Sequence, residues 1–275
     1  MAGMIEALSL KKGMRVLEIG TGTGYNAALL ALLTEQEIRS LDIDAELVTQ
    51  AQQRLRQGGY RVQVLVGDGH NGSPDGAPYD RIIATGAVHA IPAAWRDQLA
   101  EGGILVCHLQ GSLATPLVRL VKHTGYVAGT CLATPGFFLL LQHAPTPPWG
   151  QRLPWQAYDR LPVREEAHTT LDLPALLQGD AAFRLFVECA LPGLSLAYRF
   201  QQEHQRLLTC LRHGQTLLTF LPEPGGYLVQ VRGTIPLWSH LLAASDAWHQ
   251  QGKPSLHQYT VRITQDGFPL YARER

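Results

Sequence analysis

The chain has 275 residues, of which 45% are hydrophobic and 17% charged, a mixture that suits one large domain or two modest ones and excludes an intrinsically disordered protein. Its 23 basic and 23 acidic residues cancel, so we do not expect a dedicated nucleic-acid binder. The longest apolar run, residues 137–141, is far too short to cross a membrane, and residues 1–13 lack the order of a secretory signal. We therefore expect a cytoplasmic protein with no membrane partner.

The first 142 residues alternate short β-rich runs with helical patterns, which predicts a parallel sheet wound with helices. The expected strands are 15–19, 38–42, 62–66, 81–84 and 104–108, and the expected helices are 25–33, 45–57 and 92–99. Only three residues separate two further strands, 117–122 and 126–131, too few for a crossover helix. The sheet should therefore end in an antiparallel hairpin.

A proline-rich stretch divides the chain. Residues 144–162 contain five prolines, a density that predicts a linker between a first domain, residues 1–143, and a C-terminal domain, residues 163–275. In the latter we expect a smaller α+β arrangement without a recognisable chemical motif. Its expected elements are strands 207–211, 216–220 and 227–232, a helix from 236 to about 250, and a hairpin of 259–263 and 268–271.

The cysteines and histidines give no sign of a metal centre. Cys107, Cys131, Cys189 and Cys210 lie 24, 58 and 21 residues apart, without a Cys-x-x-Cys pair or histidines at zinc-ligand spacing. The 11 histidines are scattered along the chain. We expect no bound metal and four reduced thiols in the core, as is usual in the cytosol.

One motif carries chemistry: a strand that runs through a glycine-rich turn into a helix, Val16-Leu17-Glu18-Ile19-Gly20-Thr21-Gly22-Thr23-Gly24-Tyr25. Glycines let the backbone turn sharply and approach a ligand closely, and the start of a helix presents free N–H groups. The pattern indicates a nucleotide-like ligand, although such turns also serve purely structural needs.

Three residues, Tyr25, Glu18 and Asp42, narrow the choice among nucleotide-like ligands. A dinucleotide fingerprint needs a third glycine where Tyr25 stands, so an NAD-dependent oxidoreductase is disfavoured. Glu18 would repel a pyrophosphate but suits an ammonium or sulfonium group, and S-adenosylmethionine carries both. Asp42 ends the next strand, 22 residues after Gly20, where a carboxylate binds ribose hydroxyls. The alternative for Asp42 is an exposed acid at a strand end.

A second loop closes the third strand, Gly67-Asp68-Gly69. Its carboxylate can accept a hydrogen bond from the exocyclic amine of an adenine, at the same sheet edge as the first two loops. On its own, an Asp-Gly pair would be an ordinary turn.

These residues resemble the protein-L-isoaspartate O-methyltransferase family over about residues 4–141, together with the stretches Ala77-Pro78-Tyr79-Asp80-Arg81-Ile82-Ile83-Ala84-Thr85, Ile91-Pro92 and Gln98-Leu99-Ala100-Glu101-Gly102-Gly103. The glycine loop is shared by most class I methyltransferases, whereas Ala-Pro-Tyr-Asp-Arg-Ile-Ile and Gly-Asp-Gly are more particular to this family. The resemblance implies a Rossmann-like class I methyltransferase sheet with S-adenosyl-L-methionine as cofactor. It also implies methyl transfer to the α-carboxyl of an isoaspartyl residue in a protein or peptide, which leads to repair.

The same resemblance assigns the site. It implies that the cofactor is lined by Glu18, Gly20, Gly22, Gly24, Asp42, Asp68 and Gly69, and that the substrate carboxylate is bordered by Thr85, Gly86 and Ala87. No general base is expected, because a carboxylate is already ionised at neutral pH, so we assign no catalytic residue.

Some features depart from the family. Its Thr-x-Ser-x-Pro segment has no counterpart before the glycine loop, and His89 follows an imperfect alanine run. We expect His89 to be a solvent-exposed loop histidine, and the alternative is a group on the substrate side of the loop after the fourth strand. We therefore expect weak isoaspartyl methylation. An alternative hypothesis is a methyltransferase-fold interaction module that binds the cofactor but is catalytically impaired. The C-terminal part resembles only the extra domain of some bacterial members, a group in which some act on biosynthetic peptides.

Overall fold

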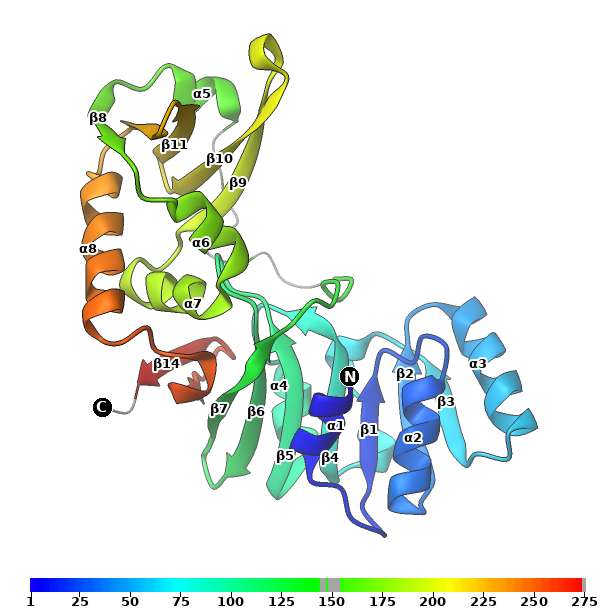
Figure 1. Cartoon of the computed structure of the whole chain (residues 1–275). Coiled ribbons are helices and arrows are strands. Elements are labelled where there is room, and N and C mark those ends of the chain that lie inside the picture. Colours follow the sequence, from blue (N-terminus) through cyan, green and yellow to red (C-terminus); the bar gives the residue numbers. More distant parts are fainter. Residues whose placement is uncertain (144–146, 148–153, 274–275) are drawn as a thin grey trace. The chain divides into compact units, whose positions relative to one another are not determined.

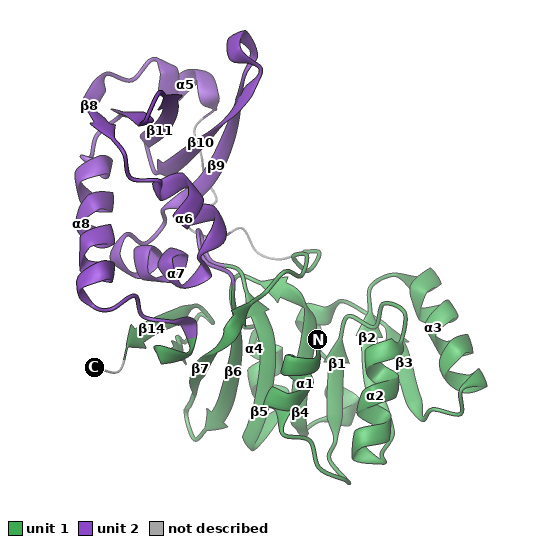
Figure 2. Cartoon of the chain, viewed as in Figure 1, with its two compact units in different colours: residues 1–110, 116–145, 257–275 green, residues 111–115, 146–256 purple. Residues whose placement is uncertain are grey.

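The computed structural model describes residues 1–143, 147 and 154–273. The chain divides into two compact units (Figure 2). Unit 1 comprises residues 1–110, 116–145 and 257–275, and unit 2 comprises residues 111–115 and 146–256. None of the described helices is long and apolar enough to cross a lipid bilayer.

A nine-stranded sheet forms the centre of unit 1, in the order β14-β13-β7-β6-β5-β4-β1-β2-β3 (Figure 1). Five neighbouring strands are parallel: β1 (Val16–Ile19), β2 (Ile38–Asp42), β3 (Val62–Val66), β4 (Tyr79–Val88) and β5 (Leu99–Leu109). The next two, β6 (Pro116–His123) and β7 (Tyr126–Pro135), run antiparallel to their neighbours. The predicted fold class, a Rossmann-like sheet with an antiparallel end, is confirmed.

The helices of unit 1 are α1 (Ala2–Leu8), α2 (Tyr25–Thr34), α3 (Ala45–Gln57) and α4 (Ala93–Gln98), with short 3-10 turns at Gly69–Asn71 and Pro74–Gly76. Helix α3 begins at Asp44, whose carboxylate accepts hydrogen bonds from the N–H groups of Glu46 and Leu47. Helix α1 was not predicted. Its Met4 and Leu8 are buried in one cluster with side chains of α2, β1, β4 and β5.

The last hairpin of the chain belongs to unit 1. Strand β13 (Tyr259–Ile263) pairs antiparallel with β7 and with β14 (Pro269–Arg273), so the two strands extend the large sheet. The predicted C-terminal domain, residues 163–275, therefore ends earlier than expected, because residues 257–275 belong to unit 1. The physical reason is the open edge of β7, on which β13 buries Tyr259, Val261 and Ile263.

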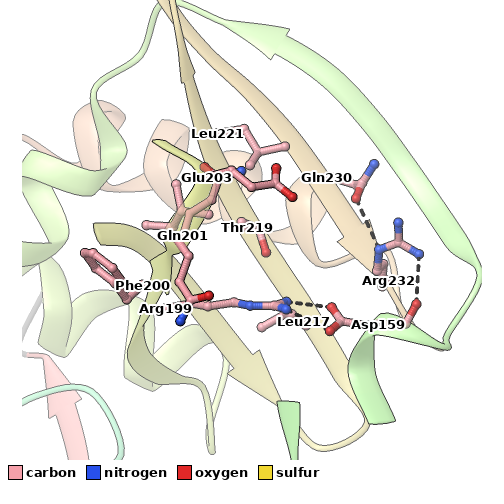
Figure 3. Close-up of a pocket in the computed structure, with 12 residues that line it drawn as sticks. Asp159, Arg199, Phe200, Gln201, Glu203, Leu217, Thr219, Leu221, Gln230 and Arg232 are labelled. Carbon is pink, nitrogen blue, oxygen red and sulfur yellow. Dashed lines mark hydrogen bonds and ion pairs between the residues drawn. The ribbon is translucent and has the colours of Figure 1, made fainter. Parts of the chain in front are cut away.

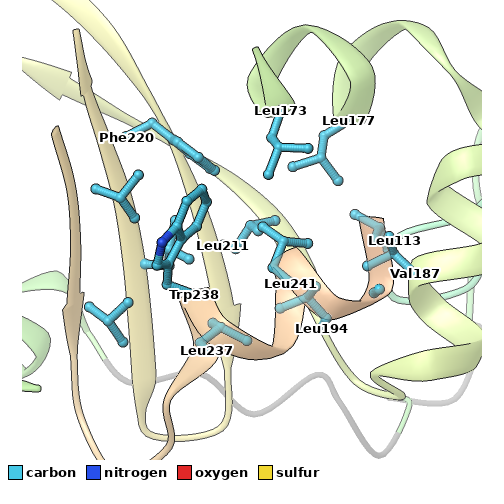
Figure 4. Packing of buried hydrophobic residues seen from close by; sticks show 14 of the residues in the cluster. Leu113, Leu173, Leu177, Val187, Leu194, Leu211, Phe220, Leu237, Trp238 and Leu241 are labelled. Carbon is cyan, nitrogen blue, oxygen red and sulfur yellow. The ribbon is translucent and has the colours of Figure 1, made fainter. Parts of the chain in front are cut away.

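Unit 2 contains a five-stranded antiparallel sheet, in the order β8-β12-β11-β10-β9. Its strands are β8 (Val163–Thr169), β9 (Ser195–Gln201), β10 (Arg206–His213), β11 (Thr216–Glu223) and β12 (Gly226–Arg232), and further 3-10 turns lie at Gln202–His204 and Leu256–Gln258. One face packs against α6 (Leu173–Gly179), α7 (Ala181–Ala190) and α8 (Leu237–Gln250), around Phe220, Trp238 and Leu241 (Figure 4). The expected α+β arrangement is present, although β8, β9, α6 and α7 were not predicted.

The opposite face of this sheet carries a polar cavity of about 470 Å³ (Figure 3). Across it, the guanidinium of Arg199 forms two hydrogen bonds with the Asp159 carboxylate, at 2.5 and 2.7 Å. Asp159 ends α5 (Trp155–Asp159), whose Tyr158 is fully buried and donates to the carbonyl of Gly214. The prediction of a linker over residues 144–162 is therefore wrong for its last part, because α5 packs into unit 2. Residues 144–146 and 148–153 of the predicted linker lie outside the described residues.

All four cysteines are free thiols. Cys107, Cys131 and Cys210 are buried, as predicted, but Cys189 is exposed. The expectation of a core thiol is wrong at that position, because Cys189 falls near the end of α7, away from the helix face that packs into the core of unit 2.

Candidate cofactor and substrate site

The glycine loop crosses the carboxyl end of β1 and is fixed from both sides. The N–H groups of Gly20 and Thr21 donate to the Leu41 carbonyl of β2, at 2.8 and 3.0 Å. On the other side, Thr85 Oγ1 of β4 donates to the carbonyl of Gly20 at 2.7 Å. Gly20 has a φ of 95°, and a Cβ there would lie 2.4 Å from Thr85 Oγ1, so the close approach requires glycine.

Glu18 lies beneath this loop with no exposed surface. Its two carboxylate oxygens accept hydrogen bonds from Asn26 Nδ2 at 2.6 Å and Ser40 Oγ at 2.5 Å. Burial raises the pKa of Glu18 to about 7, against the lowering effect of these hydrogen bonds. The side chain ties β1 to α2 and β2 and supports the loop from below, and its contact with the ligand stays a prediction.

Asp42 is held in a fixed orientation at the end of β2. Its Oδ2 accepts a hydrogen bond from the Gly22 N–H at 2.8 Å, and its Oδ1 accepts one from the Asp44 N–H at 3.1 Å. Each oxygen keeps a further lone pair, so the oriented carboxylate can accept two more donors. The side chain thus has the geometry needed for a pair of ribose hydroxyls.

Asp68 begins the turn after β3. Its carboxylate accepts from the N–H and the Nδ1 of His70, at 2.9 and 3.1 Å, and lies 3.2 Å from Nδ1 of His143. The backbone hydrogen bond from His70 is the main reason that the pKa of Asp68 is lowered, so the group is a stable anion. Next to it, Gly69 lies against Ile19, and its carbonyl accepts from Trp95 Nε1 at 2.7 Å.

The predicted substrate residues are covered by residues 137–143, which we call the strap. The Ala87 N–H donates to the Leu139 carbonyl at 2.7 Å, and the Ala87 carbonyl accepts from the Leu141 N–H at 2.9 Å. The Leu141 side chain lies over Gly86, where a Cβ would come within 2.3 Å of it. Ala87 and Gly86 therefore contact the strap, while Thr85 supports the glycine loop.

A cavity of about 50 Å³ lies where these loops meet. It brings together four predicted residues, Gly20, Asp42, Asp68 and Gly69, with Ile19, Leu41 and Ile43 of the sheet edge and two residues that the sequence analysis missed, Leu141 and Gln142. The available signal for Leu141 was the apolar run 137–141, which follows the last strand predicted for the first domain, whereas Gln142 lies just outside that run. Glu18, Gly22, Gly24 and the three substrate residues are not among the lining residues.

Two buried histidines lie near this end of the sheet. His89 is only 9% exposed and its Nδ1 is 2.7 Å from the Gln110 carbonyl, so the expectation of a solvent-exposed loop histidine is wrong. His108 of β5 is 2% exposed and packs against Gly136, just before the strap. Burial lowers the pKa of His108 to about 4, so the ring is neutral at pH 7.

The residues present fit an adenosyl ligand with an amino-acid end. Asp42 and Asp68 offer oriented acceptors at the edge of one cavity, and Gly22 has open space where its Cβ would lie. Asn26 adds a buried Oδ1 for which the described residues provide no hydrogen-bond donor. A buried acceptor without a hydrogen bond is costly, so this oxygen suits a ligand that brings an ammonium donor.

The model of the family described as Protein-L-isoaspartate(D-aspartate) O-methyltransferase matches residues 1–141. A protein-L-isoaspartate O-methyltransferase of Opitutus terrae is 44% identical over 121 residues, 44% of this chain and 52% of the relative. The corresponding protein of Ignicoccus hospitalis is 47% identical over 108 residues, 38% of this chain and 51% of the relative. The chain thus spans about half the length of these curated relatives.

A solved structure of a protein-L-isoaspartate O-methyltransferase has a similar fold over the whole chain. The TM-score is 0.56 at 22% identity, covering 100% of this chain and 80% of the other. At that identity the likeness concerns the fold, whereas the family assignment rests on the match to residues 1–141. The chain belongs to the protein-L-isoaspartate(D-aspartate) O-methyltransferase family.

Proposed function

We propose that this protein is an S-adenosylmethionine-dependent methyltransferase that acts on the α-carboxylate of isoaspartyl residues in proteins or peptides. The observation that carries the proposal is the convergence of Gly20, Asp42, Asp68 and Gly69 on one cavity at the carboxyl edge of the sheet. Family membership supports it, because every predicted site residue lies in the matched part of the chain.

Each polar group of the edge has a role in this proposal. Asp42 accepts from the ribose hydroxyls, with its carboxylate oriented by Gly22 and Asp44. Asp68 accepts from the adenine amine, and Gly69 leaves room for the ring. Asn26 Oδ1 receives the ammonium of the amino-acid end, while Glu18 holds the Asn26 amide in place.

For methyl transfer to a carboxylate, the main task of the chain is to position the two reacting groups. The cofactor supplies a methyl group activated by positive sulfur, and an ionised carboxylate attacks it without losing a proton. The methyl–sulfur bond breaks as the methyl–oxygen bond forms, and the sulfur takes the electron pair. The chain has to hold the carboxylate about 3–3.5 Å from the methyl, on the line of the breaking bond, and to exclude water. In this proposal Gly86 and Ala87 border the substrate carboxylate once the strap, which covers them, has moved aside.

The place of action is also a proposal. We place the protein in the cytoplasm, supported by four cysteines that form no disulfide. Its partner there is the protein or peptide that carries the isoaspartyl residue.

A methyl-transfer assay tests the function. The purified chain is given cofactor labelled in the methyl group and one of two peptides that differ only in an isoaspartyl or an aspartyl linkage. We expect base-labile label on the isoaspartyl peptide alone, and calorimetric binding of the cofactor and of its demethylated product. Absence of binding and transfer contradicts the proposal, whereas binding without transfer favours the interaction-module alternative.

A further inference from the structure

The two edges of the unit 2 sheet differ in character. One edge is β8, Val-Arg-Glu-Glu-Ala-His-Thr, which carries four titratable side chains. The other is β9, Ser-Leu-Ala-Tyr-Arg-Phe-Gln, which pairs with β10 on one side and with no described strand on the other. Charged side chains protect an exposed edge from pairing with another chain, and an apolar edge lacks that protection. Edge β9 is thus the candidate contact surface.

Strands β9 and β10 form a hairpin (Figure 1), and apolar side chains gather on one of its faces. Tyr198, Phe200 and Leu207 are 46%, 54% and 60% exposed, and Leu207 lies directly opposite Phe200. The helices of unit 2 cover this face only as far as Thr209, which is hydrogen-bonded to Gln178 of α6. Phe200 and Leu207 therefore extend the helix-packed face beyond its helices, and Tyr198, directly opposite Thr209, lies at the boundary.

On the other face of β9, the one charged side chain of the strand already has a partner within unit 2. Arg199 points to the polar cavity, away from Phe200, and is paired with Asp159 (Figure 3). Its charge is therefore neutralised within unit 2 and does not oppose the approach of another strand along the edge.

We propose that β9 is a dimerisation edge, on which a second copy of this chain adds its own β9 in antiparallel orientation. A two-fold axis through Tyr198 sets Tyr198 opposite the partner's Tyr198 and Phe200 opposite the partner's Leu196. On the other face, Arg199 lies opposite the partner's Ala197. No like charges meet, and on the Tyr198 face each apolar side chain faces another. The strand is self-complementary.

A two-fold axis through the central residue of β8 brings like charges together. It sets Glu166 opposite its own copy, and Arg164 opposite the partner's His168. Like charges directly opposite are unfavourable in a ladder. When each strand is paired with its copy about its central residue, β9 is therefore better suited to self-pairing than β8.

Sedimentation of the full chain over a dilution series tests the proposal. We expect a reversible dimer, lost in Tyr198→Lys because two ammonium groups then face each other across the axis. Val163→Lys, at a comparably exposed position on edge β8, is the matched control and should remain dimeric. An equal mixture of Tyr198→Lys and Tyr198→Glu should restore the dimer as a mixed species. A monomeric parent chain, or a dimer that Tyr198→Lys leaves intact, overturns the proposal.

Disulfide cross-linking tests the register in which β9 pairs with its copy, and this test is independent of the charge variants at Tyr198. In a Cys189→Ser background, which removes the exposed native thiol, Tyr198→Cys should form an intermolecular disulfide, because directly opposed Cβ atoms lie about 4.5–5.5 Å apart. Gln201→Cys should not, because its copy lies about 20 Å along the ladder. A dimer in which Tyr198→Cys fails to cross-link contradicts this edge pairing.

Discussion

Ser40 Oγ of β2 donates a hydrogen bond of 2.5 Å to the fully buried carboxylate of Glu18 on β1, and the pKa of Glu18 is raised to about 7. Since the folded state binds this proton more tightly than the unfolded chain does, the group contributes most stability below its unfolded pKa of 4.5. That contribution is lost as the pH rises from 4.5 to about 7.

We therefore predict that Glu18→Gln removes a pH dependence of about 3 kcal/mol in the free energy of unfolding between pH 4.5 and 8. Urea titrations at a series of pH values measure it for the parent and the variant. Glu46→Gln, an exposed change in the first turn of α3, is the control and should follow the parent curve. Parallel curves for the parent and Glu18→Gln would show that the carboxylate is solvated in the folded state.

Asp42→Asn should weaken cofactor binding without unfolding the protein. The amide keeps an oxygen for the Gly22 N–H but loses the charge and one acceptor for the ribose, a loss of about 1.5–3 kcal/mol or roughly 10- to 150-fold in Kd. Calorimetry with S-adenosylmethionine checks the affinity. Asp44→Asn is the matched control, because Asp44 caps α3 and does not line the cavity. Equal losses in both variants would contradict a ribose contact by Asp42.

Leu141→Ala should speed the association of the cofactor. The cavity of about 50 Å³ is far smaller than the roughly 300 Å³ or more of typical ligand pockets, so Leu141, which lies over Gly86, has to move on binding. Leu139→Ala truncates a side chain that is 89% exposed and should leave the rate unchanged. Stopped-flow binding measures both. The prediction fails if the two variants associate at the same rate.

Glu188→Ala should destabilise unit 2. The part-buried carboxylate accepts hydrogen bonds from the N–H groups of Ser112, Leu113 and Ala114, and thereby holds residues 111–115 within this unit. Its removal leaves three backbone donors unpaired, at a cost of about 1–3 kcal/mol each where they stay dry. Thermal unfolding should show a lower Tm than for Glu203→Ala, an exposed control. Equal Tm values would mean that water replaces the carboxylate.

Local signals explain which features could be predicted. Strands β2 and β3 and helix α3 have their predicted bounds, because the spacing of apolar residues within each segment is enough to distinguish a strand from a helix. The pairing of β13 with β7 joins residues about 130 positions apart and has no local signature, so the final hairpin was assigned to the other unit. Likewise, nothing near Glu18 in the sequence marks Ser40 as its partner.

His108→Phe should make the protein more resistant to acid. Because burial lowers the pKa of this histidine from 6.5 to about 4, its neutral form stabilises the fold above pH 6.5, and that contribution is lost as the pH falls from 6.5 towards 4. The loss for the parent chain amounts to about 3 kcal/mol, which the phenylalanine variant avoids by having no proton to gain. Urea titrations at pH 7.5 and 4.5 compare the two, and His240→Phe, at an exposed position on α8, is the control that should behave like the parent. Because His108 packs against Gly136 just before the strap, acid should also increase proteolysis within residues 137–143 of the parent and less in His108→Phe. An identical acid sensitivity of His108→Phe and the parent would show that the imidazole is protonated without cost in the folded state.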